Sequence, residues 1–410
     1  MKIITTLFAF LIGILSLNAQ DSWYQVDSVN GAPRAAATAF KVGPFAYVAT
    51  GLEEYGFSRK MHSYDLWQND WDNETSLGNA IGQGLDRASA ISFSSEINQK
   101  GYLGLGQTET VAYMNDLWEF DVVTNVWTQK ANFIGSPRKQ AVAFTLQSTD
   151  LAYVGTGQDA TGLTKDFYTY NASTNTWTQI QDFPGLARRG AVAYSGDNHG
   201  FIGTGDAGIL LNDFWMYDAT LDTWIQKAPF PGSPRSGAVA WTTDSDIDHP
   251  QGYIALGEDN FNEFKKDVWE YNYYTNSWMQ RSDFPGVGRK DAVAFSIQGI
   301  AYVGTGYNGV FHDDFYAYSG TADVEVKDDL TEFTIFPNPT NSLVEFTEIQ
   351  EELIGYRIYA ASGDLIFEEM NNPSQLHSIN LWEQARLPGV YLIQLLGKKC
   401  TYPLKKIILQ

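Results

Sequence analysis

Residues that carry metal, redox or acid–base chemistry are scarce in this chain of 410 residues. Cys400 is the only cysteine, which excludes an intrachain disulfide, a cysteine-based zinc cluster and a cysteine–cysteine redox pair. The five histidines lack the His-x-His and His-Glu-x-x-His spacings of zinc sites. Neither a Gly-x-Ser-x-Gly turn nor a Gly-x-x-x-x-Gly-Lys phosphate loop occurs. The sequence therefore predicts no cofactor, no metal centre and no catalytic residue of these classes.

Positive charge is scarce as well. The chain carries 27 Lys and Arg against 48 Asp and Glu, a formal net charge of −21. A surface of this sign repels phosphate backbones and anionic lipids. We therefore expect neither a nucleic acid nor a membrane surface as a partner.

The N-terminus holds a single long hydrophobic run. It extends from Ile3 to Leu17, follows Lys2, and leads into the small residue Ala19. This pattern predicts a signal peptide over residues 1–19. The run is too short for a comfortable membrane span and lacks a basic flank, so we expect no membrane insertion after cleavage. An uncleaved anchor is the alternative.

Glycine and aromatic residues are abundant: there are 37 glycines, and aromatic residues make up 14% of the chain. This composition favours many short strands joined by tight turns, and thus an all-β protein. A seven-residue segment that begins with arginine, such as Arg138–Phe144 (RKQAVAF), recurs along the chain. Its leading arginines are 47 to 54 residues apart: Arg34, Arg87, Arg138, Arg188, Arg235 and Arg289. We number the repeats 1 to 6 by these arginines.

Further markers recur in the same register. Each repeat has an aromatic-x-x-x-Gly strand, as in Tyr153–Gly157, and then a strand that ends in an aromatic residue, as in Tyr170. In five repeats a tryptophan stands seven residues after that aromatic, as Trp177 does. Each repeat is thus predicted to form four strands, which is one blade of a propeller.

Repeat 6 lacks its own tryptophan, because Glu325 stands seven residues after Tyr318. Trp23, however, precedes Arg34 by eleven residues, as Trp177 precedes Arg188. We therefore expect the N-terminal strand to complete the last blade and to close the ring.

These markers, from Ser22 to about Ser319, resemble kelch repeats, which have a period near 50 residues. The resemblance implies a six-bladed kelch-type β-propeller over residues 20–320. Two departures stand out: Gly-Thr-Gly or Ala-Thr-Gly replaces the usual pair of glycines, and Lys60 in repeat 1 replaces the aspartate of most repeats.

An acidic linker is predicted over residues 321–332, followed by a smaller β-domain over 333–410. This domain carries Phe336-Pro-Asn-Pro339, Tyr359-Ala-Ala-Ser-Gly363 and Leu387-Pro-Gly-Val-Tyr-Leu392, and it ends in Leu404-Lys-Lys-Ile-Ile-Leu409. In that order these motifs resemble the C-terminal sorting domain of type IX secretion cargo. The resemblance implies an immunoglobulin-like β-sandwich, export through the periplasm to the cell surface or beyond, and the secretion machinery as a partner. A sandwich domain with a binding role of its own is the alternative.

Two positions of each repeat are predicted to form a binding site. In peptide-binding kelch domains, the residues after the leading arginine and after the strand-ending glycine line one mouth of the channel. Here the rim residues implied by this resemblance are Gln107, Gln158, Asp206, Glu258, Tyr307, Lys139, Arg189, Lys290 and Asp291. Arg189 and Lys290 predict a local positive patch that would favour a carboxylate-bearing ligand. A solvated loop surface without a ligand is the alternative.

One acidic loop, with Asp244, Asp246 and Asp248, could present oxygens to calcium. The glycine and distal glutamate of a calcium loop are not at the required spacing, so a solvated loop is favoured.

From these features we expect an exported, non-enzymatic module that binds a glycan, a peptide or a protein. Two alternatives remain open. The first is a carbohydrate-active enzyme such as a sugar-acid epimerase or mutarotase, with Glu258, Asp206 and Arg189 as the acid–base candidates. The second is a structural surface protein without a discrete ligand.

Overall fold

A computed structural model describes residues 21–319 except 67, 80–83, 96, 197, 243–250 and 298. In the C-terminal part it describes residues 334–336, 340, 343–347, 353–360, 365–370, 378–382, 389–397 and 405–409. The predicted signal peptide, the acidic linker and the calcium candidates Asp244, Asp246 and Asp248 lie outside the described residues.

The all-β architecture expected from the sequence is confirmed, and each repeat contributes one antiparallel sheet. The first strands are β3 (Thr38–Val42), β7 (Ile91–Ser95), β11 (Val142–Leu146), β17 (Val192–Ser195), β22 (Val239–Thr242) and β27 (Val293–Ile297). The second strands are β4 (Phe45–Glu53), β8 (Lys100–Gly104), β12 (Leu151–Gly155), β18 (His199–Gly203), β23 (Gly252–Ala255) and β28 (Ile300–Gly304).

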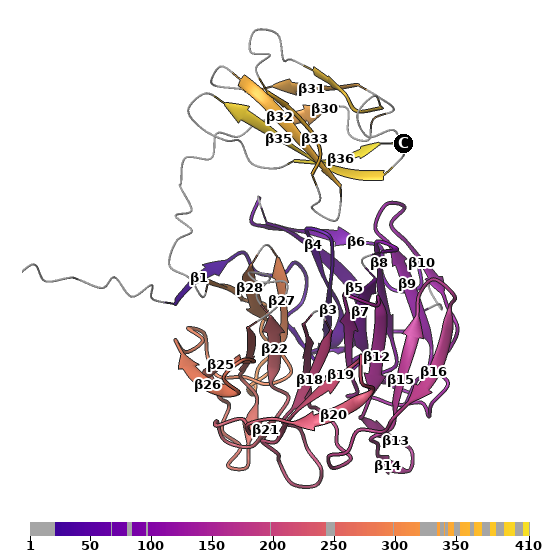
Figure 1. Cartoon of the computed structure of the whole chain (residues 1–410), viewed down its shortest axis with the longest axis vertical. Coiled ribbons are helices and arrows are strands. Elements are labelled where there is room, and N and C mark those ends of the chain that lie inside the picture. Colours follow the sequence, from indigo (N-terminus) through magenta and orange to yellow (C-terminus); the bar gives the residue numbers. More distant parts are fainter. Residues whose placement is uncertain are drawn as a thin grey trace, which may run out of the picture.

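The third strands are β5 (Gly56–Asp65), β9 (Leu117–Asp121), β15 (Phe167–Asn171), β19 (Phe214–Asp218), β25 (Val268–Asn272) and β29 (Phe315–Ser319). The outermost strands are β6 (Asp70–Glu74), β10 (Val126–Gln129), β16 (Thr176–Ile180), β20 (Thr223–Gln226), β26 (Ser277–Arg281) and, for repeat 6, β1 (Ser22–Val26). The loops add the short strands β2 (Arg34–Ala35), β13 (Gln158–Asp159), β14 (Gly162–Leu163), β21 (Arg235–Ser236) and β24 (Glu258–Asp259). Figure 1 shows the sheets around a common centre, with β3, β22 and β27 near the middle and β16, β20 and β26 at the periphery.

The N-terminal strand β1 pairs antiparallel with β29. Trp23 lies opposite Tyr318, just as Trp177 lies opposite Tyr170 in repeat 3. First strands of successive repeats contact one another in chain order, and β27 of repeat 6 contacts β3 of repeat 1.

The inner strands alternate between two environments. In β11 the side chains of Val142 and Phe144 are buried between sheets, while Ala143 lies between them on the opposite face and lines the central space. The ring of Phe144 packs so closely on the next sheet that a Cβ at Gly200 would lie 2.0 Å from it. Glycine at this position therefore allows two sheets to approach.

The leading arginines are buried structural residues. In repeats 2 to 6 each forms an ion pair, with N–O distances of 2.5 to 2.6 Å, with the aspartate that precedes the third strand of its own repeat. Repeat 1 has Lys60 instead of this aspartate, and the Nη2 atom of Arg34 lies 3.2 Å from the His62 Nε2 atom and 3.3 Å from the Glu53 carboxylate. The repeated arginines thus hold the framework together.

The C-terminal part consists of two small sheets. One has the order β30 (Thr334–Phe336), β31 (Leu343–Thr347) and β34 (Ser378–Asn380). The other has the order β33 (Leu365–Met370), β32 (Leu353–Ala360), β35 (Gly389–Gly397) and β36 (Lys405–Leu409). Buried residues of both sheets, such as Val344 and Ile393, belong to one hydrophobic core. Among the described residues, no helix has the length and hydropathy of a membrane span.

Candidate functional site

The two rim positions predicted from the sequence lie side by side in every repeat. The residue after each leading arginine forms an antiparallel bridge with the residue after the strand-ending glycine of the same repeat. The six pairs are Ala35–Leu52, Ala88–Gln107, Lys139–Gln158, Arg189–Asp206, Ser236–Glu258 and Lys290–Tyr307. Repetition of one backbone geometry thus gathers these side chains at one end of the sheets.

The next residue of each repeat belongs to a cycle of backbone hydrogen bonds. Each of these residues has a positive φ between 51° and 63°: Ala36, Ser89, Gln140, Gly190, Gly237 and Asp291. Each N–H donates to the carbonyl of the equivalent residue in the preceding repeat, and the cycle closes with Ala36 N–H donating to the Asp291 carbonyl at 2.8 Å. All six N–H groups are consumed within the cycle. The sequence gives little sign of it, because these six residue types share no chemistry.

A second cycle of backbone hydrogen bonds runs beside the first. The N–H of each strand-ending glycine donates to the carbonyl of the leading arginine in the next repeat, over 2.7 to 2.9 Å. Gly306 of repeat 6 donates to Arg34 of repeat 1 at 2.8 Å.

The cations of the rim are held by acceptors of their own or the preceding repeat. The Arg189 guanidinium donates to the Asp206 carboxylate at 3.0 Å and to the Gln158 side-chain oxygen at 2.6 Å. The Lys290 ammonium lies 2.5 Å from the Glu258 carboxylate. The sequence predicted a positive patch at Arg189 and Lys290. In the structure, the carboxylates of Asp206 and Glu258 neutralise these two cations.

Lys139 is held differently. Its ammonium donates to the Gln107 side-chain oxygen at 2.7 Å and lies 5.5 Å from the centre of the Tyr113 ring.

A cavity of about 440 Å³ lies at this mouth, beside repeats 3 to 6. It is lined by Gln140, Arg189, Gly190, Asp206, Leu210, Ser236, Gly237, Glu258, Asp259, Asn260, Asn262, Lys290 and Asp291. Of the predicted rim residues, it brings together Arg189, Asp206, Glu258, Lys290 and Asp291. The other four, Gln107, Gln158, Lys139 and Tyr307, are outside its lining.

Asp291 is the carboxylate of this cavity that forms no ion pair or side-chain hydrogen bond. Burial, together with the nearby Glu258 carboxylate and against the opposing effect of Lys290, raises the pKa of Asp291 to about 6. A Cβ at Gly237 would meet its Oδ1 atom at 2.8 Å, so the carboxylate lies over repeat 5. The lining holds two cations, Arg189 and Lys290, against four carboxylates.

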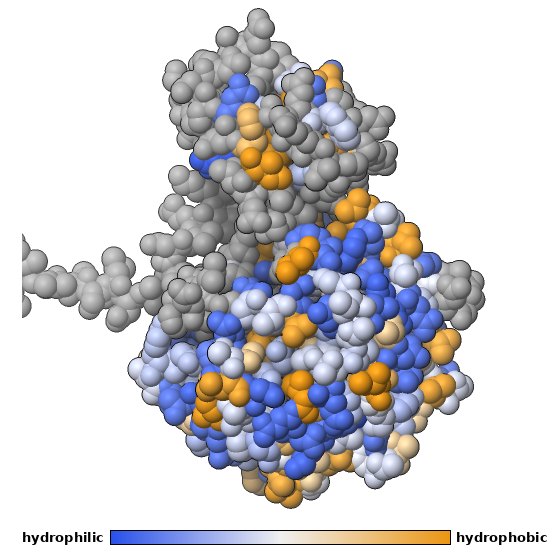
Figure 2. Space-filling view, turned by 45° about the vertical axis from the view of Figure 1, so that its right-hand side comes forward, coloured by the Kyte–Doolittle hydropathy of each residue, from blue (hydrophilic) through white to orange (hydrophobic). Residues whose placement is uncertain are grey.

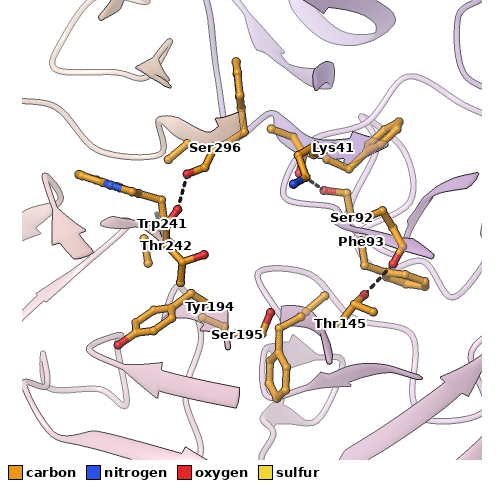
Figure 3. Close-up of a pocket in the computed structure, with 18 of the residues that line it drawn as sticks. Lys41, Ser92, Phe93, Thr145, Tyr194, Ser195, Trp241, Thr242 and Ser296 are labelled. Carbon is orange, nitrogen blue, oxygen red and sulfur yellow. Dashed lines mark hydrogen bonds between the residues drawn. The ribbon is translucent and has the colours of Figure 1, made fainter. Parts of the chain in front are cut away.

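The central space continues from this mouth through a bore lined mainly by alanine side chains of the first strands. At its other end, a cavity of about 240 Å³ is bordered by a ring of small hydroxyl residues and Lys41. Figure 3 shows Thr145, Ser195, Thr242 and Ser296 around an open centre, with the rings of Tyr194 and Trp241 turned away from it. Thr145 and Ser296 donate to carbonyls of the preceding repeat, at 2.9 and 2.5 Å. Sequence reasoning missed this ring, although its signal is the Ser or Thr that follows the buried aromatic in five repeats.

Within the described residues, no group of three or more His, Cys, Asp and Glu side chains is placed to hold a metal ion.

Comparison with known families identifies both parts of the chain. The family described as KLHDC2/KLHL20/DRC7 Kelch-repeats domain matches residues 36–248, just over half of the chain. The chain therefore belongs to the kelch-repeat family, as the sequence markers predicted. The family described as Secretion system C-terminal sorting domain matches residues 334–410, which indicates export by type IX secretion to the cell surface or outside. No curated protein matches the chain.

Proposed function

We propose that residues 20–320 form a six-bladed propeller closed by β1, and that residues 333–410 form an immunoglobulin-like sorting domain. The two cycles of backbone hydrogen bonds support the closed ring, because each passes through all six repeats and returns to repeat 1. Pairing of β1 with β29 supports the completion of blade 6 by the N-terminal strand. The two small sheets around one core support a sandwich in the tail.

We propose further that the protein is an exported binding module whose ligand, a protein, peptide or glycan, sits on the mouth lined by Arg189, Asp206, Glu258, Lys290 and Asp291. The observation that carries this proposal is the polar cavity in which side chains from several repeats converge. Convergent polar groups around a concave site are the usual features of a ligand site. The acid–base candidates Asp206 and Glu258 are each engaged in an ion pair, which favours binding over catalysis.

The test is binding of the purified protein to a glycan array and to a peptide library. For a ligand that bears a carboxylate, Arg189→Ala combined with Lys290→Ala should cost about 2–4 kcal/mol of binding free energy, because charge-assisted hydrogen bonds are lost. Lys139→Ala is the matched control, since it removes a rim cation outside the cavity. Unchanged affinity for such a ligand in the double variant, with an unchanged melting temperature, would show that it does not bind at this mouth.

A sugar-acid epimerase or mutarotase is the second candidate, favoured by Asp291, whose raised pKa suits proton transfer near neutral pH. Anomer exchange of uronic or sialic acids, followed by NMR, tests it. Activity that disappears in Asp291→Asn would establish the enzyme, and absence of exchange with the parent protein would exclude this activity.

A further inference from the structure

Exposed apolar side chains stand at corresponding places at the end of the sheets that holds the cavity, whose lining includes Leu210 and Asn260 of these loops. They occupy the tips of the loops between second and third strands in five of the six repeats, within the described residues. We call these residues the apolar crown: Tyr55, Val111, Ile209, Phe261 and Val310. In repeat 3 the corresponding tip, between β13 and β14, carries Ala160 and Thr161. The loops of the crown are the same loops whose first residues form the rim.

The crown is held in place by the loop backbone. The N–H of Ala207 donates to the Ile209 carbonyl at 2.9 Å, and the N–H of Asn308 donates to the Val310 carbonyl at 3.2 Å. The Phe261 N–H donates to the Asp259 carboxylate at 2.9 Å. These turns leave Phe261 81% exposed and Ile209 65% exposed, and Tyr55 in repeat 1 is 95% exposed. A loop backbone fixed in this way loses little further conformational entropy when a partner covers it.

Exposure of single apolar residues is ordinary, and Figure 2 shows isolated orange patches within a mainly blue surface. The crown differs because its members recur at one structural position, in loops that follow the rim residues. Exposed apolar side chains that gather on one surface mark sites of protein interaction.

The excess of carboxylates in the cavity favours a partner with a positively charged group. The cavity lining holds two cations against four carboxylates, and both cations are already paired with carboxylates. Asp259 is paired with Lys265 at 2.7 Å. Asp291 is left without an ion pair, and the N–H groups of its hydrogen-bond cycle are consumed. The mouth therefore offers acceptors to an incoming group, within a chain whose net charge is −21.

We propose that the partner is a protein segment that places a Lys or Arg side chain in the cavity beside Asp291, with apolar side chains on either side against the crown. This proposal rests on the proposed binding function of the mouth and names the class of its ligand. A cation that enters beside Asp291 gains a carboxylate without breaking the two existing ion pairs. A carboxylate ligand would instead have to displace Asp206 from Arg189 or Glu258 from Lys290.

The experiment uses the full mature protein and a set of synthetic octapeptides, with affinity measured by fluorescence anisotropy. The central residue is Lys, Arg, Gln or Glu, and the flanking residues are Leu or Ser. Peptides with Lys or Arg between leucines should bind best. Glu at the centre, or Ser at the flanks, should weaken binding about tenfold or more, because an ion pair or buried apolar area is lost.

Repeats 4 and 5 supply matched variants. Ile209→Ser and Phe261→Ser should weaken binding several-fold, whereas Leu221→Ser and Tyr274→Ser should leave it unchanged. Leu221 is 64% exposed, nearly as much as Ile209, and it follows β19, whereas Ile209 precedes that strand. Asp291→Asn should abolish the preference for Lys over Glu, and asparagine retains the positive φ of this position.

Equal affinity for Lys-centred and Glu-centred peptides would overturn the proposal, and so would equal loss of affinity in crown and control variants. Failure of every peptide to bind at millimolar concentration would overturn it as well. If an acidic peptide or a glycan binds instead, and binding requires Arg189 and Lys290, the binding function stands while this partner class is wrong.

Discussion

Trp23 offers the sharpest test of ring closure, because it joins the N-terminal strand to the last two sheets. Its ring lies 4.8 Å from that of Tyr318, 5.5 Å from that of Phe284 and 6.3 Å from that of Trp241, measured between centroids. Its indole N–H donates to the Ser282 carbonyl at 3.0 Å. If β1 closes the ring, replacing Trp23 by Ala should weaken the whole domain.

The expected loss follows from these contacts. Truncation of a buried Trp to Ala costs about 3–5 kcal/mol. Trp23 is partly exposed, so we expect about 2–4 kcal/mol, which includes one hydrogen bond of about 1 kcal/mol. For a domain of about 300 residues, that corresponds to a fall in melting temperature of about 3–6 °C.

Thermal unfolding followed by circular dichroism and light scattering measures the effect. Gln25→Ala, an exposed position of the same strand, is the control and should leave the melting temperature unchanged. Deletion of residues 21–26 should in addition leave the edge of β29 unpaired and promote aggregation. A Trp23→Ala variant that melts within about 2 °C of the parent, without aggregation of the deletion variant, would refute the closure of the ring by β1.

Three further predictions follow from individual residues. Burial and the neighbouring Arg34 lower the pKa of His62 from 6.5 to about 4. Between those two pH values the unfolded chain therefore takes up a proton that the folded chain does not. Stability should fall as the pH drops through this range, by up to about 3 kcal/mol, and His62→Gln should flatten this part of the profile measured by urea unfolding. Thr156→Val should raise stability by about 1 kcal/mol, because the Thr156 hydroxyl is buried without a hydrogen-bond partner; a lower melting temperature would contradict this. Removal of residues 320–410 should leave the propeller's melting temperature unchanged but retain the protein in the periplasm, and efficient release of the shortened protein would refute the role of the tail in export.

The sequence predicted those features that depend on residues repeated in register. The leading arginines and the tryptophans recur because each fills the same buried position in successive sheets, so their spacing encodes the strand order. In repeat 1, Lys60 replaces the aspartate that pairs with the leading arginine in the other repeats. Arg34 contacts His62 and Glu53 instead.

Features that depend on the backbone or on contacts between repeats could not be predicted in this way. The cycle through Ala36 and Asp291 requires a positive φ, which residues as different as alanine, glutamine and aspartate adopt here. The contact of Arg189 with Gln158 joins side chains 31 positions apart, across two repeats. This hydrogen bond depends on how close the two sheets lie, and no local sequence pattern indicates it. The sequence therefore did not predict the ion pairs of Arg189 and Lys290 with carboxylates.

This division between repeated and variable residues explains how one framework can carry a specific site. At the cycle of positive φ, the backbone has the same conformation whether the residue is Gly190, with no side chain, or Asp291, with a carboxylate. Residues that adopt a positive φ can therefore replace one another at this position while the backbone cycle is kept. The loop tips vary as well, since Thr161 of repeat 3 stands in place of an apolar residue. Ligand specificity should consequently reside in the asymmetry of these positions, with the carboxylate of Asp291 in repeat 6 and the gap in the apolar crown at repeat 3 setting the orientation of a bound partner.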